Sequence, residues 1–235
     1  MHGPSSAYAW GFYGYERLCL RILALSDTHE LHRELDRLPE SDILIHAGDW
    51  TFFSKRLAAI EDFDEWLADQ PVRHRSILTP GNHEFYLEAD HSRRTLTSSA
   101  TVLIEEALTI KGLKIWGSPI TSLYGAAFGI SDPAKRAAHY ASIPSDTHIL
   151  VTHGPPYGIL DGKPGTSEHF GCPELLMAVQ RVKPLVHIFG HVHTGYGVLE
   201  TPETTYINAS LLGPDGDILN RPVFFDLPLR KGKGK

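Results

Sequence analysis

The chain has 235 residues, and its hydrophobic content of 42% is enough to build one large domain with a buried core. Its formal net charge of −6 argues against a protein that coats nucleic acid or binds a membrane through a polybasic surface. No apolar run reaches the roughly 18 residues that a membrane helix needs, and the two cysteines, Cys19 and Cys172, are too few for a disulfide scaffold.

The two ends of the chain differ in composition from the rest. Residues 1–17 are rich in Gly, Tyr and Ser, and residues 228–235 are basic, so we predict a tail on either side of one domain over residues 18–227. The first residues contain no basic region followed by an apolar stretch, so we expect no secretory signal. Together with the scarcity of cysteine, this predicts a cytoplasmic protein.

Short runs of Leu and β-branched residues recur along the predicted domain and are typical of strands buried on both faces. In chain order they are Leu18–Leu25, Ile43–His46, Arg75–Leu78, Leu113–Trp116, His148–Thr152 and Leu185–Phe189. Amphipathic stretches between them predict helices, at Leu57–Leu67, Pro133–Tyr140 and Pro173–Val182. Three later runs predict a meander of strands, at Gly197–Leu199, Thr204–Ile207 and Val223–Asp226. This order predicts an α/β fold whose sheet layers are covered by helices.

Side chains that bind metals follow the predicted strands directly, at the points where these strands end. Because the carboxyl ends of parallel strands meet at one edge of a sheet, we expect these side chains to converge. Asp27 and His29 are two positions apart, as are His191 and His193, so in extended backbone each pair points the same way. The candidate ligands are two carboxylates, one amide and four imidazoles, at Asp27, Asp49, Asn82, His29, His153, His191 and His193.

This set of side chains also limits the metals that can bind. Seven ligands are too many for one tetrahedral ion and suit two ions that share a bridging carboxylate. Mixed nitrogen and oxygen ligands favour Mn, Fe, Zn, Co or Ni over Ca or Mg, and the lack of thiolate ligands argues against structural zinc. Two dications would also remove the cost of burying Asp27 and Asp49 together. The sequence therefore predicts two divalent transition-metal ions, with Mn, Fe or Zn preferred.

The candidate ligands lie in five blocks whose order resembles that of the calcineurin-like metallophosphoesterases over about residues 20–227. The blocks are Ser-Asp-Thr-His at 26–29, Gly-Asp at 48–49, Gly-Asn-His-Glu at 81–84, His-Gly-Pro-Pro at 153–156 and Gly-His-Val-His at 190–193. Longer strings resemble the metallophosphoesterase-domain-containing (MPPED) branch, which is described as phosphodiesterase-like, at Ile43–Asp49, His187–Gly197 and Ile207–Ser210. The resemblance implies a four-layer α/β/β/α sandwich around a dinuclear metal centre.

The resemblance also implies a role for each residue. By the pattern of the family, one ion would be held by Asp27, His29, Asp49 and His193, and the other by Asp49, Asn82, His153 and His191, with Asp49 bridging. His83 would not be a ligand; it would face the leaving group or a phosphoryl oxygen, and either His83 or a metal-ordered water would protonate the leaving oxygen. Two dications can lower the pKa of a bridging water, and the resulting hydroxide would attack phosphorus without a covalent phosphoenzyme.

Two classes of function stay open. The first is a metal-dependent phosphoesterase that acts on a small phosphodiester or phosphomonoester, with the diester slightly favoured. The alternative is a non-catalytic metal-binding or nucleotide-binding scaffold of the same fold. Many family members carry Asp or Arg shortly after the Gly-Asp block, where this chain has Trp50, Thr51, Phe52 and Phe53, so we expect metal to meet most of the substrate's charge.

The expected partner is a small phosphorylated substrate, with no nucleic acid and no membrane, and the oligomeric state is left open. The net charge disfavours a nuclease, because binding a phosphate backbone needs clustered Lys and Arg. His46 and Asn208 are candidates for supporting the centre from outside, and His169 is a candidate for lining the pocket. The remaining histidines outside the blocks are interpreted as surface or structural residues, at His32, His74, His91, His139 and His148.

Overall fold

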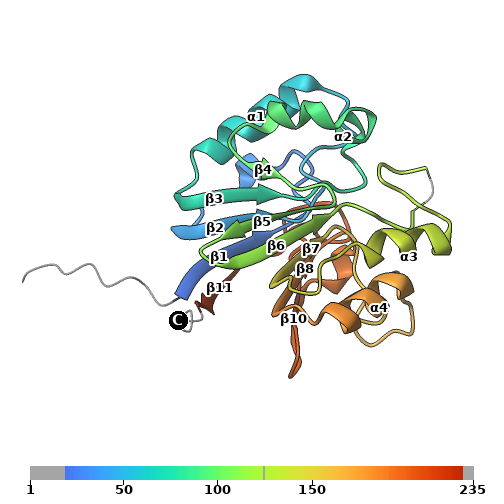
Figure 1. Ribbon diagram of the computed structural model, residues 1–235. Helices are drawn as coiled ribbons and strands as arrows, with labels where there is room; N and C mark the ends of the chain where they lie inside the picture. The colour runs from blue at the N-terminus through green and yellow to red at the C-terminus, as the bar shows by residue number, and fades with distance from the viewer. Residues whose placement is uncertain (1–18, 124, 230–235) are drawn as a thin grey trace, which may run out of the picture.

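The computed structural model describes residues 19–123 and 125–229. Two β-sheets lie face to face, and helices cover the outer face of each sheet (Figure 1). This confirms the α/β class and the four-layer α/β/β/α arrangement. The predicted N-terminal tail and residues 230–235 lie outside the described residues, whereas Pro228 belongs to the last strand.

The first sheet has the strand order β11-β1-β2-β3-β4. Strands β1 to β4 are parallel to one another, and β11 pairs antiparallel with β1. Because β1, β2 and β3 are parallel neighbours, the segments that follow them leave from one edge of the sheet. The bounds are β1 Cys19–Leu25, β2 Ser41–His46, β3 Val72–Leu78, β4 Thr101–Val102 and β11 Val223–Pro228.

The second sheet has the strand order β5-β6-β7-β8-β10-β9. Strands β6, β7, β8 and β10 are parallel, while β5 and β9 pair antiparallel at the two edges. His153 follows β7 directly, and His191 stands two residues beyond β8. The bounds are β5 Glu106–Ile110, β6 Leu113–Ser118, β7 Ile149–Thr152, β8 Val186–Phe189, β9 Gly197–Glu200 and β10 Thr205–Asn208.

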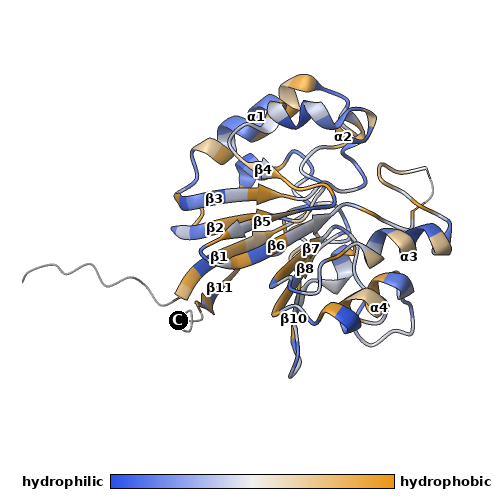
Figure 2. Cartoon of the chain, in the orientation of Figure 1, coloured by the Kyte–Doolittle hydropathy of each residue, from blue (hydrophilic) through white to orange (hydrophobic). Residues whose placement is uncertain are grey.

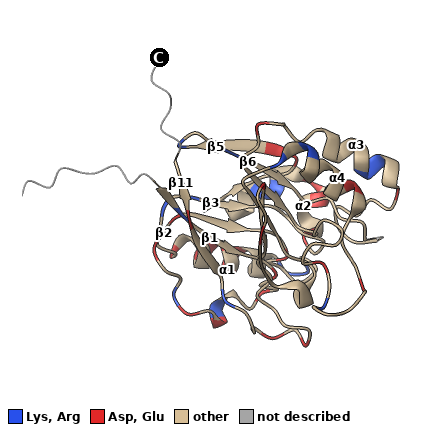
Figure 3. Cartoon of the chain, turned by 90° about the horizontal axis from the view of Figure 1, so that it is seen from below, with Lys and Arg blue, Asp and Glu red and all other residues tan. Residues whose placement is uncertain are grey.

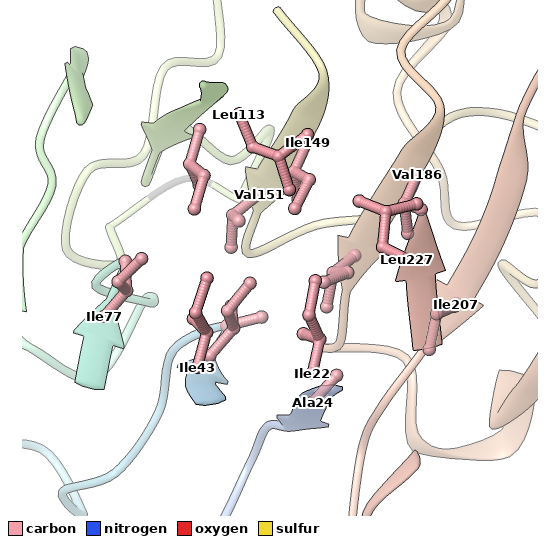
Figure 4. Packing of buried hydrophobic residues seen from close by; sticks show 14 of the residues in the cluster. Ile22, Ala24, Ile43, Ile77, Leu113, Ile149, Val151, Val186, Ile207 and Leu227 are labelled. Carbon is pink, nitrogen blue, oxygen red and sulfur yellow. The ribbon is translucent and has the colours of Figure 1, made fainter. Parts of the chain in front are cut away.

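Successive residues of each strand face opposite layers, because side chains alternate along a strand. In β1, Ile22 and Ala24 face the other sheet, whereas Leu23 and Leu25 pack under the helices. The strands accordingly carry much of the hydrophobic colour in Figure 2. Figure 4 shows the central layer, where residues of the two sheets meet, including Ile22, Ala24, Ile43, Ile77, Leu113, Ile149, Val151, Val186 and Ile207.

Helices α1 (Leu57–Ala68) and α2 (Phe85–Ala89), with the short turns η1 (His32–Glu34) and η2 (His91–Thr97), lie on the side of the first sheet (Figure 1). Helices α3 (Pro133–Ala141) and α4 (Pro173–Val182) cover the second sheet. The apolar periodicity places Leu57 on the inner face of α1, but this first residue is 54% exposed, and Trp66 is buried there instead. Among the described residues, no helix combines the length and apolar character needed to cross a membrane.

Strands β4 and β5 were not predicted from the sequence. Strand β4 has only two residues, and β5 is an edge strand whose side chains alternate between half-buried and exposed, so neither forms an apolar run. Strand β5 reaches β6 through Lys111 and Gly112, which have φ values of 50° and 83°. Two successive positive φ values are what a two-residue hairpin turn of type I′ requires.

Candidate metal centre

The metal-binding side chains predicted from five separate strand ends converge between the two sheets. The Nδ1 atom of His153, after β7, lies 2.8 Å from the carbonyl oxygen of Ala47, after β2. The backbone N–H of His191, after β8, donates to the carboxylate of Asp27, after β1, at 2.9 Å. Both contacts join the first sheet to the second. The predicted convergence at the carboxyl ends of the strands is therefore confirmed.

The backbone that presents these side chains is not extended, so that part of the prediction is wrong. Asp27, His29, Asp49 and His191 have φ values of 55°, 41°, 58° and 66°. This left-handed region is uncommon for residues other than glycine, and such strained conformations gather at functional sites. Hydrogen bonds hold the loops in this shape: Asp27 N–H donates to Gly48 O at 2.9 Å, and His29 N–H donates to Asp49 O at 3.0 Å.

One group of ligands consists of Asp27, His29 and His193. One ligand atom from each lies within 4.8 Å of the others. The Nε2 atom of His193 lies 3.6 Å from Asp27 Oδ1, and the Nε2 atom of His29 lies 3.7 Å from Asp49 Oδ2. Asp49 therefore borders this group, as the family resemblance implies for a bridging carboxylate.

The second group consists of Asp49, His153 and His191, whose ligand atoms also lie within 4.8 Å of one another. His153 Nε2 lies 3.2 Å from Asp49 Oδ2 and 2.8 Å from Asn82 Oδ1. Since Nδ1 of His153 must donate to a carbonyl, the lone pair of a neutral ring lies on Nε2. The three acceptor atoms His153 Nε2, Asp49 Oδ2 and Asn82 Oδ1 would then face one another. They repel one another unless a proton or a cation lies among them. This donor set fits a metal ion.

His83 has the opposite arrangement of its two ring nitrogens. Its Nε2 lies 3.8 Å from Asp49 Oδ2, and it forms a third candidate group with His29 and Asp49. However, the backbone N–H of Phe53 donates to His83 Nδ1 at 3.3 Å. An N–H donor on Nδ1 places the proton of the neutral ring on Nε2, so His83 points a donor, and not a lone pair, at the centre. In His193, by contrast, Nδ1 faces the carbonyl oxygen of Gly213 at 3.3 Å, which leaves Nε2 free to bind metal.

The carboxylates of the centre are buried without Lys or Arg as a partner. Asp27 and Asp49 are 0% and 2% exposed, and their ion pairs within the described residues are to histidines alone. Burial by itself raises the pKa of Asp27, but the contact with His193 and the charges of nearby imidazoles bring this pKa well below its ordinary value. Burial lowers the pKa of His153, but the charge and hydrogen bonding of Asp49, the charge of Asp27 and the contact with Ala47 together outweigh it and raise this pKa to about 9. Two divalent cations would supply the positive charge that the cluster otherwise takes from a protonated imidazole.

Glu84 is the important residue whose role the sequence did not indicate. Its buried carboxylate accepts N–H bonds from Asp49 at 2.9 Å, Gly81 at 2.7 Å and Thr51 at 3.0 Å. Burial and the charge of Asp49 raise its pKa to about 7, although the three N–H donors act in the opposite direction. Glu84 thus joins the loop after β2 to the loop after β3. The sequence feature that could have pointed to Glu84 is its position at the end of the Gly-Asn-His-Glu block.

Gly81 and Gly190 lie against the two buried carboxylates of the centre, where a side chain would not fit. A Cβ atom on Gly81 would lie 2.3 Å from Asp49 Oδ1, and one on Gly190 would lie 2.2 Å from Asp27 Oδ2. Both distances are too short for any side chain. These glycines let the backbone come close to the two buried carboxylates.

The predicted supporting residues have mixed outcomes. Asn208 donates through Nδ2 to the carbonyl oxygen of Val192 at 2.9 Å, so it supports the loop that carries His191 and His193, as predicted. His46 Nε2 lies 3.1 Å from Thr28 Oγ1, and it touches the loops between the ligands rather than a ligand imidazole. His169 pairs with Asp161 at 2.9 Å and is absent from the candidate metal groups of the described residues.

The other residues outside the blocks have structural contacts. Burial raises the pKa of Cys172, whose thiol contacts Glu174 at 3.1 Å. His32 pairs with Asp62 and His139 pairs with Glu105.

Comparisons with known proteins place these features in a family. A family model described as calcineurin-like phosphoesterase matches residues 20–195. Human metallophosphoesterase domain-containing protein 1 is 34% identical over 234 residues, which cover 88% of this chain and 71% of the human protein. UPF0046 protein K07C11.7 of Caenorhabditis elegans is 35% identical, and the alignment covers 89% of this chain and 76% of the worm protein. The crystal structure of TT1561 of Thermus thermophilus aligns with a TM-score of 0.57 at 13% identity, over 81% of this chain and 88% of that one, and shows a shared fold.

Proposed function

Because this chain belongs to the calcineurin-like phosphoesterase family, we propose that it hydrolyses a small phosphoester with the help of two divalent metal ions. The observation that carries the proposal is the position of Asp49. Its Oδ2 atom lies 3.7 Å from His29 Nε2 and 3.2 Å from His153 Nε2, so that one carboxylate borders both groups of ligands. A shared carboxylate is the usual feature of a site with two metal ions.

We assign the first ion to Asp27, His29, Asp49 and His193, and the second to Asp49, Asn82, His153 and His191. When bound, such ions would neutralise the phosphoryl oxygens and lower the pKa of the water that attacks phosphorus. The nitrogen and oxygen donors favour Mn, Fe or Zn. The protein holds the ligands in place by hydrogen bonds from their other polar atoms, such as the contact of His153 Nδ1 with Ala47 O.

His83 is the proposed catalytic residue. Its Nε2–H points toward the side of the centre where Asp49 Oδ2 lies, at 3.8 Å. From there it can donate to a phosphoryl oxygen or to the oxygen of the leaving alcohol, a contribution typically worth about 10²–10⁴ in rate. Burial lowers the pKa of His83, and the Phe53 N–H on Nδ1 keeps a ring proton on Nε2, the atom that faces the centre.

We propose a phosphodiester as the preferred substrate. A monoester carries close to two negative charges at neutral pH, whereas a diester carries one. The loop after β2 continues through Trp50, Thr51, Phe52 and Phe53, which offer no charged side chain for the second charge. The centre is therefore better suited to the less charged ester.

The test combines metal analysis with two chromogenic substrates. The purified chain is expected to bind about two transition-metal ions and to hydrolyse bis(p-nitrophenyl) phosphate faster than p-nitrophenyl phosphate. Faster turnover of the monoester would overturn the diester preference. Binding of metal without hydrolysis of either ester would favour a non-catalytic scaffold of the same fold.

We further propose that the partner is a small phosphorylated molecule in the cytoplasm, without nucleic acid or membrane. In the view of Figure 3, segments with Lys and Arg are interspersed with segments carrying Asp and Glu. Binding to a nucleic acid backbone favours a continuous basic surface. Competition by added DNA in the diester assay tests this proposal, and the expected result is no inhibition.

A further inference from the structure

Two phenylalanines beside the metal centre are exposed, although aromatic side chains usually contribute to buried cores. Phe52 is 49% exposed and Phe53 is 40% exposed. Both lie on the loop after β2 that carries Asp49, and they follow the fully buried Trp50. Their ring centroids lie 4.8 Å apart with an angle of 70° between the planes, which is an edge-to-face pair. We call this pair the aromatic platform.

The aromatic platform adjoins both a candidate metal ligand and the proposed catalytic residue. The ring of Phe52 lies 5.8 Å from the ring of His29, edge to face. The ring of Phe53 stacks on the ring of His83, with the centroids 4.0 Å apart. An ester whose phosphate lies at the centre would therefore extend its organic group past the exposed rings.

The loop that carries the platform is held in a strained conformation. Phe53 and Ser54 have φ values of 59° and 51°, in a region that a bulky side chain rarely adopts. Phe52 N–H donates to the Glu30 carboxylate at 3.1 Å, and Ser54 Oγ donates to the carbonyl oxygen of His83 at 2.6 Å. The bond from Phe53 N–H to His83 Nδ1 adds a third link. These contacts fix the two rings relative to His83, so the platform is built into the site.

A cation lies beside the same rings. Lys55 Nζ is 5.9 Å from the centroid of Phe52 and 5.1 Å from that of Phe53, within the range of a cation–π contact. The surface therefore offers an aromatic face next to a positive charge.

We propose that Phe52 and Phe53 bind the planar aromatic or heteroaromatic group of the ester, so that the enzyme prefers aryl esters to alkyl esters. This inference rests on the proposed function and narrows its substrate class. Phe52 offers the more exposed ring, while Phe53 is stacked on His83. A flat ring gains an aromatic pair interaction on Phe52, whereas an alkyl group gains only the burial of apolar area.

The test measures binding, which separates the platform from the chemistry of the leaving group. Phenylphosphonate and cyclohexylphosphonate both carry a six-membered carbon ring, which is planar and aromatic only in the first, and neither is hydrolysed. Their dissociation constants for the metal-loaded full chain are measured by calorimetry. We expect the preference for phenylphosphonate to fall about threefold to tenfold in Phe52→Leu and to be kept in Phe52→Trp. Phe224→Leu, at an exposed phenylalanine of β11, is the matched control and should keep the wild-type preference.

The two ways of failing are distinguishable. Suppose that Phe52→Leu keeps the wild-type preference while the wild-type chain binds metal and hydrolyses the diester. The proposed role of the aromatic platform is then wrong, and the proposed function stands. If the wild-type chain binds neither metal nor phosphonate, the proposed function fails, and the platform fails with it.

Discussion

At the scale of single residues, the partner of one ring nitrogen decides what each histidine of the centre can do. A backbone carbonyl lies against Nδ1 of His153 and of His193, so the lone pair on Nε2 is free for a metal. A backbone N–H lies against Nδ1 of His83, so its Nε2 carries a proton. The same type of side chain thus presents a lone pair to the centre at two positions and an N–H donor at a third.

The role of His83 leads to the first prediction. His83→Ala should keep the wild-type metal content and lose about 10²-fold or more in kcat. The loss should be smaller for p-nitrophenyl esters than for esters of poorer leaving groups, because a good leaving group needs less protonation. Steady-state kinetics with both kinds of ester and metal analysis check this. A variant without metal would show that His83 is a ligand.

Asp49 leads to a second prediction of the opposite kind. Asp49→Ala should lose both metal ions and nearly all activity, because its carboxylate borders both groups of ligands. Asp146→Asn, at an exposed carboxylate that pairs with Lys114, is the matched control and should keep both. Loss of only one ion from Asp49→Ala would contradict the bridging role.

At the scale of elements, the centre depends on loops that are tied to one another rather than on the strands alone. Glu84 follows β3 and accepts hydrogen bonds from the backbone N–H groups of Asp49 and Thr51, which follow β2. The strained φ values of Asp27 and Asp49 persist because such bonds offset their cost. The strands bring the loops to one edge, and the bonds between loops set the directions of the ligands.

The third prediction tests this link between loops. Glu84→Gln should lower the free energy of unfolding by about 1–3 kcal/mol, because the amide NH₂ of Gln would face a backbone N–H group that now donates a hydrogen bond to the carboxylate. Glu65→Gln, at an exposed carboxylate on α1, is the control and should change stability by less than about 0.5 kcal/mol. Urea unfolding of the three proteins measures the difference. Equal stability of Glu84→Gln and wild type would contradict the role of Glu84.

At the scale of the whole molecule, two sheets close on a single apolar layer, and buried histidines lie close to that core. His187 is fully buried in β8, and its Nε2 lies 2.9 Å from Thr152 Oγ1. That hydroxyl donates to Gly154 O, so His187 Nε2 must donate to it, and Nδ1 is left without a partner. Burial therefore lowers the pKa of His187 to about 3.

The fourth prediction follows from this depressed pKa. The unfolded chain gains a proton at His187 as the pH falls below about 6.5, while the folded chain stays neutral there until about pH 3. The contribution of neutral His187 to the free energy of unfolding is thus fully present above pH 6.5. It is lost as the pH falls, with a slope of about 1.4 kcal/mol per pH unit. His187→Phe should reduce the slope of unfolding free energy between pH 6 and 5 by about this amount. Equal slopes in His187→Phe and wild type would contradict the prediction.

The elements and ligands that could be predicted from the sequence are those with a strong local pattern. Strand β7 is a continuous apolar run between polar residues, and His153 follows it directly, so both were expected. Edge strand β5 has no such pattern, since Glu106 and Thr109 interrupt its apolar residues. Leu57 matches the periodicity of α1, but it is the first residue of the helix and is largely exposed.

The layered α/β fold and the candidate metal ligands could be inferred from the amino-acid sequence alone, because apolar periodicity and residue type are local properties of the chain. The direction of each candidate ligand, the proton position on His83 and the link made by Glu84 follow from the folded arrangement. These depend on hydrogen bonds between residues far apart along the chain, such as that of His191 N–H to Asp27. The packing of the two sheets creates these contacts, and no local pattern specifies them.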